Sequence, residues 1–179
     1  MFKKMEIIKE LIEKPFELVW NTLTAETKQI VSNRILEYEL EEYERNYYTK
    51  TIINRTEPIK LKDFYQPLFI RRFGRNFSDE RIETTDCKTL FSENNFVTLI
   101  GTAGSGKSTI LKYLLVNSIE TKFKVPIKIE LRYLNTYQGS LIKFIKEEIF
   151  KLSQLAFDEN IIDRLLKSGK FLIFLDGYD

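Results

Sequence analysis

The feature that most constrains this chain is the glycine-rich stretch GTAGSGKS, residues 101–108. It matches the pattern G-x-x-x-x-G-K-[ST] at every fixed position. The glycines permit positive φ angles, so successive backbone amides can face one anion, while the lysine and the serine suit a phosphate and its metal ion. A turn that only joined a strand to a helix would need neither side chain. The stretch therefore predicts a phosphate-binding loop.

The segments on either side predict the strand and the helix that such a loop requires. Residues 96–100 are a short apolar run, and residues 107–117 place apolar residues on one helical face. A helix that begins at the loop directs N–H groups and the positive end of its dipole toward a phosphate. Lys107 would contact the β- and γ-phosphates, and the Ser108 hydroxyl would bind Mg²⁺. The predicted nucleotide-binding residues are Gly101, Thr102, Ala103, Gly104, Ser105, Gly106, Lys107, Ser108 and Thr109.

A second segment, FLIFLDGYD at residues 171–179, supplies a candidate metal ligand. Its apolar run ends in Asp176 and is typical of a strand buried on both faces of a parallel sheet. A carboxylate in that place can hold Mg²⁺ directly or through a water molecule. Many buried strands end in an aspartate at a turn, so the metal interpretation depends on the phosphate loop about 70 residues upstream. In nucleotide hydrolysis a water molecule attacks the γ-phosphate. Gly177 has no side chain, so it would leave room for Asp179 to approach that water.

The remaining pattern after residue 95 alternates between strands and helices. Residues 125–131 predict a strand, and residues 140–152 and 158–167 predict helices. The alternation predicts an α/β fold, a three-layer sandwich with a parallel central sheet, truncated at residue 179. Residues 58–179 would be the N-terminal part of the nucleotide-binding domain, and residues 1–57 a small α-helical segment before it. Residues 55–75 predict extended linker and strand, and residues 76–95 irregular structure.

Composition excludes several classes of protein. The chain has 28 basic and 26 acidic residues, so no global field favours nucleic acid or an anionic membrane. A single cysteine excludes an internal disulfide, and the absence of histidine removes the commonest metal ligand. No run of about 18 apolar residues occurs, so we expect a soluble, cytoplasmic protein. The basic cluster Arg71, Arg72 and Arg75 is more typical of a surface or interdomain contact than of a nucleic-acid site.

Together these motifs resemble the NACHT family of signal-transducing P-loop ATPases, a branch of the STAND class. The resemblance covers residues 58–179. It is carried by GTAGSGKST, by FLIFLDGYD, by VPIKIELRYL followed by SLIKFIKEEI, and by IKLKDFYQPLFI before the loop. It implies Mg²⁺-dependent binding of ATP, or of GTP or dATP, by a switch that self-associates when a downstream sensor domain is engaged and that controls an effector, in bacteria often in antiphage defence.

The resemblance also implies roles for individual residues. Lys107 and Asp179 would be catalytic, and Ser108 and Asp176 would hold the metal ion. Tyr65, Pro67 and Leu68 would either wall the base pocket or pack in the core.

The chain ends at Asp179, before a further acidic residue, the later strands and the sensors of the family pattern. An open sheet edge would expose apolar surface, so we expect a piece of a longer protein that hydrolyses little nucleotide by itself.

Two alternatives to a switch stay open. One is another P-loop NTPase without a signalling role, a small-substrate kinase or a GTPase, although the guanine signature Asn-Lys-x-Asp is absent from this sequence. The other is a helical interaction module on a degenerate nucleotide fold, which the intact Lys107, Ser108 and Asp176 argue against.

Overall fold

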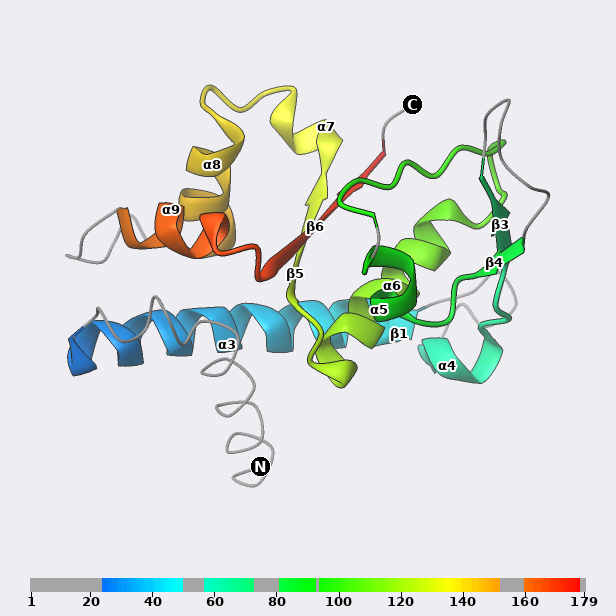
Figure 1. Ribbon diagram of the computed structural model, residues 1–179, viewed down its shortest axis with the longest axis horizontal. Helices are drawn as coiled ribbons and strands as arrows, with labels where there is room; N and C mark the ends of the chain where they lie inside the picture. The colour runs from blue at the N-terminus through cyan, green and yellow to red at the C-terminus, as the bar shows by residue number, and fades with distance from the viewer. Residues whose placement is uncertain (1–23, 50–56, 73–80, 93, 152–159, 178–179) are drawn as a thin grey trace. The chain divides into compact units, whose positions relative to one another are not determined.

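The computed structural model describes residues 24–49, 57–72, 81–92, 94–151 and 160–177 (Figure 1). The chain divides into two compact units, Met1–Glu42 with Lys124–Asp179, and Tyr43–Phe123. Helix α3 (Ala25–Tyr47) contributes its length up to Glu42 to the first unit and its last residues to the second. The first part of the predicted helical segment, residues 1–23, lies outside the described residues, as do Arg75 and Asp179.

The first unit contains a parallel pair of strands. Strand β5 (Val125–Glu130) pairs with β6 (Phe171–Asp176), in a register that runs from Val125↔Phe171 to Glu130↔Asp176. Both strands were predicted from their apolar patterns, and both are present. The prediction that β6 is buried on both faces was wrong, because Ile173 and Leu175 are 41% and 47% exposed. The described part of the chain is thus mixed α/β, with a small parallel sheet packed against helices, and two further pairs of strands are antiparallel.

Helices connect the two parallel strands. In the described part of this connection they include α7 (Leu131–Leu134), α8 (Leu141–Phe144) and α9 (Asn160–Lys167). The Ser140 hydroxyl accepts a hydrogen bond of 3.2 Å from the Lys143 N–H and so caps α8. Gly169, at φ 71°, follows the end of α9. The helix predicted at residues 158–167 is confirmed in its described part, and the one predicted at residues 140–152 is an α-helix over Leu141–Phe144.

Helix α8 continues into a π-helical turn, η2 (Ile145–Ile149). The Phe150 N–H donates to the Ile145 carbonyl at 3.0 Å, five residues back. This wider turn brings residues five apart onto one face of the helix. Ile145 and Phe150 are accordingly both buried in the same core. The sequence predicted a regular α-helix in this place.

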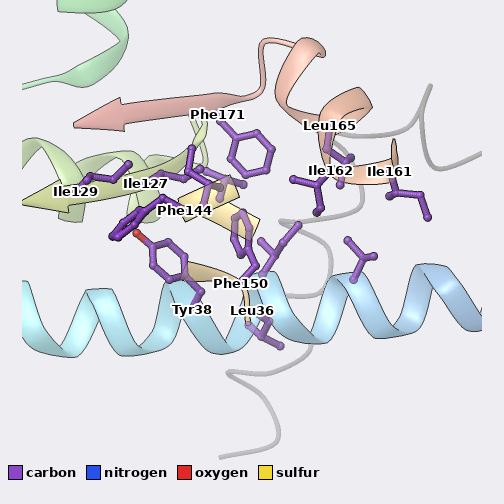
Figure 2. Packing of buried hydrophobic residues seen from close by; sticks show 14 residues of the cluster. Leu36, Tyr38, Ile127, Ile129, Phe144, Phe150, Ile161, Ile162, Leu165 and Phe171 are labelled. Carbon is purple, nitrogen blue, oxygen red and sulfur yellow. The ribbon is translucent and has the colours of Figure 1, made fainter. Parts of the chain in front are cut away.

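The core of the first unit lies between α3, the β5–β6 pair and α9 (Figure 2). Tyr38 of α3 packs edge-on against Phe150, with ring centroids 5.5 Å apart. The Tyr38 hydroxyl also accepts a hydrogen bond of 2.9 Å from the backbone N–H of Lys128 in β5. One side chain therefore fills the core and satisfies a backbone donor of the sheet. The labelled core residues are Leu36, Tyr38, Ile127, Ile129, Phe144, Phe150, Ile161, Ile162, Leu165 and Phe171.

The second unit is arranged around helix α6 (Lys107–Thr121). Strand β1 (Tyr48–Thr49) pairs antiparallel with β2 (Ile59–Lys60), which leads into the one-turn helix α4 (Leu61–Phe64). Strands β3 (Phe69–Arg71) and β4 (Arg81–Glu83) form a second antiparallel pair, followed by α5 (Cys87–Phe91). One buried cluster of this unit contains Leu61, Tyr65 and Val116, with Tyr43, Tyr47, Phe64 and Tyr113 packed against them.

Predictions about the segment before α6 were confirmed only in part. Residues 55–75 contain strands β2 and β3, as predicted, but also the helical turn α4, and residues 76–95, predicted to be irregular, contain β4 and α5. The expected strand at residues 96–100 is absent, and Phe96 and Ile100 are 96% and 82% exposed. A short apolar run becomes a strand only where another strand pairs with its backbone, and among the described residues none pairs with this one.

The buried carboxyl of Glu39 in α3 predicts a pH-dependent stability. Burial raises its pKa from 4.5 to about 7. The folded chain therefore keeps a proton that the unfolded chain releases, so the free energy of unfolding falls as pH rises from about 4.5 through 7. Glu39→Gln should remove this loss and stabilise the chain by roughly 2–3 kcal/mol above pH 7. Urea unfolding at pH 5 and pH 8 measures the difference.

The exposed Glu41, in the same helix, provides the control. Glu41→Gln should leave the pH dependence unchanged. Equal stabilisation by Glu39→Gln at both pH values would contradict the assignment.

Candidate functional site

The predicted phosphate loop lies between the irregular residues 94–100 and helix α6, within the second unit. Gly106 is the N-cap of α6 and has φ 87° and ψ 11°, in the left-handed region. Gly104 also has a positive φ, 76°. These values are strained for other residues, so the two glycines have the role that the motif predicted.

Hydrogen bonds define the shape of the loop. The Ser105 N–H donates to the Thr102 carbonyl at 3.2 Å, which closes a turn. The Ile110 N–H donates to the Gly106 carbonyl at 2.9 Å, the first helical bond of α6. In any α-helix the N–H groups of the first turn receive no acceptor from the helix itself. The loop thus leads directly into the N-terminus of α6, and a helix N-terminus attracts anions.

The ammonium group of Lys107 lies across the start of the loop. Its Nζ donates to the Gly101 carbonyl at 2.7 Å and to the Thr102 carbonyl at 3.0 Å. An ammonium group has three N–H donors, so two hydrogen bonds leave one for a further acceptor. The positive charge is therefore fixed beside the loop backbone and keeps the capacity to bind an anionic oxygen.

Helix α6 is held in place by the short helix α5. The Asp86 carboxylate accepts a hydrogen bond of 2.8 Å from the Thr89 N–H and caps α5. The Cys87 N–H donates to Asn117 Oδ1 at 2.9 Å, and the Cys87 thiol donates to the Leu114 carbonyl at 2.8 Å. Both acceptors belong to α6, so the first turn of α5 is attached to the middle of the loop helix.

Other predicted site residues are placed as follows. Thr102, Ala103, Ser105 and Ser108 are exposed. Thr109, in the first turn of α6, is half-buried. Asp176 is the last residue of β6, at the strand end that the sequence predicted. It belongs to the first unit, whereas the loop residues belong to the second. Asp179 lies outside the described residues.

The carboxyl edge of the sheet carries a second acidic residue that sequence reasoning missed. Glu130 ends β5 and pairs in register with Asp176. Arg132 forms an ion pair with Glu130, with Nη2 to Oε2 at 2.5 Å. A signal was available in the sequence, because an acidic residue follows the alternating run VPIKI as Asp176 follows FLIFL. Within the described residues no three acidic or cysteine side chains gather to hold a metal ion by themselves.

The three candidates for a base pocket differ in their surroundings. Tyr65 is buried, its ring is stacked on Tyr113 at 3.9 Å between centroids, and its hydroxyl lies 2.7 Å from Thr84 Oγ1. It therefore packs in the core. Pro67 is exposed. Leu68 lies beside Gly106 of the loop.

Comparisons with protein-family models, with curated proteins and with solved structures found no match for this chain. Among the described helices, none has an apolar stretch long enough to cross a membrane.

The attachment of α5 to α6 predicts that the Cys87 thiol is unreactive in the folded chain. Burial raises the pKa of this thiol to about 12, and the thiolate is the reactive form. Iodoacetamide at pH 8 should label the native chain at least about 100 times more slowly than the chain in urea. Mass spectrometry over time measures both rates. Similar rates with and without urea would show that α5 is not packed on α6 as described.

Proposed function

We propose that residues 101–109 bind the phosphates of a nucleotide together with Mg²⁺. One observation supports this most strongly, the pair of hydrogen bonds that hold the Lys107 ammonium against the carbonyls of Gly101 and Thr102 at the start of α6. The same short segment thus contains a fixed cation, a helix N-terminus and two glycines in the left-handed region. Each of these attracts or accommodates an anion, and a polyphosphate could use all of them at once.

The proposal assigns Mg²⁺ to Ser108 and Asp176. Mg²⁺ keeps several waters and takes one or two protein ligands in addition to phosphate oxygens, so it does not need a dedicated cluster of carboxylates. Asp176 at the end of β6 has the chemistry for this role. The predicted contribution of Asp179 to water activation belongs to the same proposal.

The wider proposal is an ATP-dependent switch of the NACHT type, in the cytoplasm. It rests on the sequence resemblance over residues 58–179 and includes the three-layer sandwich with a longer parallel sheet. In that proposal nucleotide binding controls self-association and an effector through further domains, in bacterial antiphage defence or innate immunity. The parallel register of β5 and β6 agrees with such a sheet and supports it.

Removal of the Lys107 charge tests the phosphate site. Lys107→Ala should lower the affinity of the full chain for Mg·ATP by about 10- to 100-fold, because a charge-assisted hydrogen bond to phosphate is lost. Isothermal titration calorimetry measures the dissociation constant. Lys112→Ala, in the same helix but beyond its first turn, is the matched control and should bind as the unmodified chain does. Unchanged affinity in Lys107→Ala would refute the proposal.

Asp176→Asn tests the metal ligand. The variant should bind ATP in EDTA as the unmodified chain does, but should lose most of the gain in affinity that Mg²⁺ provides, because the carboxylate no longer holds the ion. Titration of MgCl₂ at fixed ATP measures this. Glu130→Gln, at the register partner, should have the smaller effect. Equal effects of the two variants would mean that the charge of the sheet edge matters, and not Asp176 itself.

A further inference from the structure

One side chain from outside the phosphate loop packs directly on it. A Cβ added to Gly106 would lie 2.8 Å from Cδ1 of Leu68, so the Leu68 side chain rests on the bare α-carbon of that glycine. Gly106 is the N-cap of α6, at the point where the loop becomes the helix. Leu68 itself is 37% exposed, so burial in a core does not explain its position.

The backbone of Leu68 is held by Thr84, which is fully buried. The Thr84 N–H donates to the Leu68 carbonyl at 3.2 Å, and the Thr84 hydroxyl donates to the same carbonyl at 2.9 Å. The Tyr65 hydroxyl lies 2.7 Å from Thr84 Oγ1 and donates to the Thr84 carbonyl at 3.2 Å. Tyr65 and Thr84 thus fix the backbone position of Leu68, whose side chain contacts the loop.

The same group is anchored to the helix that follows the loop. The Tyr65 ring stacks on Tyr113 of α6, with centroids 3.9 Å apart and planes 13° apart. The contacts therefore form a closed path from α6 through Tyr65, Thr84 and Leu68 to Gly106 and back into α6. In such a path the loop glycine and the helix cannot move independently without loss of a packed or hydrogen-bonded contact.

We propose that Leu68 is a positioning residue that holds the phosphate loop in its binding conformation. The inference rests on the proposed function, since it concerns the same site. Glycines have many accessible backbone conformations, and restricting them during binding lowers affinity. By packing on Gly106, Leu68 restricts this glycine before the ligand arrives. Leu68 would contribute to affinity through the conformation of the loop and not through a contact with the ligand. The contribution therefore does not require that the ligand has a base.

A ligand without a base separates this role from a base contact. In Leu68→Ala, the affinities of the full chain for Mg·ATP and for Mg·tripolyphosphate should fall by the same factor, about tenfold. Calorimetric titration with both ligands measures this, and thermal unfolding checks that the variant is folded. Phe69→Ala, at the neighbouring and more exposed apolar residue, is the matched control and should change neither affinity.

Each other outcome is decisive. A fall for Mg·ATP alone would mean that Leu68 contacts the nucleoside, and no fall for either ligand would mean that it does not position the loop; both results overturn the inference and leave the proposed function intact. Binding of neither ligand by the unmodified chain would refute the proposed function, and the inference with it.

A double-mutant cycle tests the contact itself. Gly106→Ala should weaken tripolyphosphate binding for two reasons, the strained φ of 87° and the collision with Leu68. Leu68→Ala removes the collision, so the double variant should bind better than the product of the two single effects. Thr84→Val, which removes the hydroxyl that holds Leu68, should weaken both ligands equally. The proposed path of contacts would be overturned if the effects of the two substitutions on affinity simply multiplied. It would also be overturned if Thr84→Val bound both ligands as tightly as the unmodified chain.

Discussion

The two hydrogen bonds from the Lys107 ammonium to the carbonyls of Gly101 and Thr102 connect the ends of the loop. They bring the first residues of the motif to the first residue of α6, and the left-handed glycines between them make this short connection possible. A hydrogen bond from a charged donor is stronger than one between neutral groups. Two such bonds can therefore order an exposed segment that buries little apolar surface. The proposed anion site depends on this arrangement.

The rest of the second unit provides a frame for α6. The aromatic stack of Tyr65 on Tyr113 and the hydrogen bonds of Cys87 to Asn117 and Leu114 attach two preceding segments to this helix. An anion site needs such support, because each loop residue that must be ordered on binding reduces the affinity. In the first unit, Tyr38 similarly attaches one element to others, since it joins α3 to both the core and the backbone of β5.

Local patterns predicted the elements that depend on local signals. The helix after the loop, the strands β5 and β6, and the helix that Ser140 caps were all evident from apolar periodicity and capping residues. The glycine conformations followed from the motif. The strand at residues 96–100 was wrong, because an apolar run does not specify its pairing partner. The pairing of β3 with β4 and the π-helical turn at Ile145 were missed for the same reason, since cross-strand pairing and core packing decide them. The contact of Leu68 with Gly106 also has no local signal, as the two residues are far apart in the sequence.

The proposed site requires the backbone amides of this loop to bind a polyphosphate. The most direct measurement is the change in amide chemical shifts when tripolyphosphate is added to the ¹⁵N-labelled chain. We expect large, saturable shifts for Gly104, Gly106 and Lys107, because their N–H groups would donate to phosphate oxygens. Shifts spread over surface lysines, with these three amides unmoved, would contradict it.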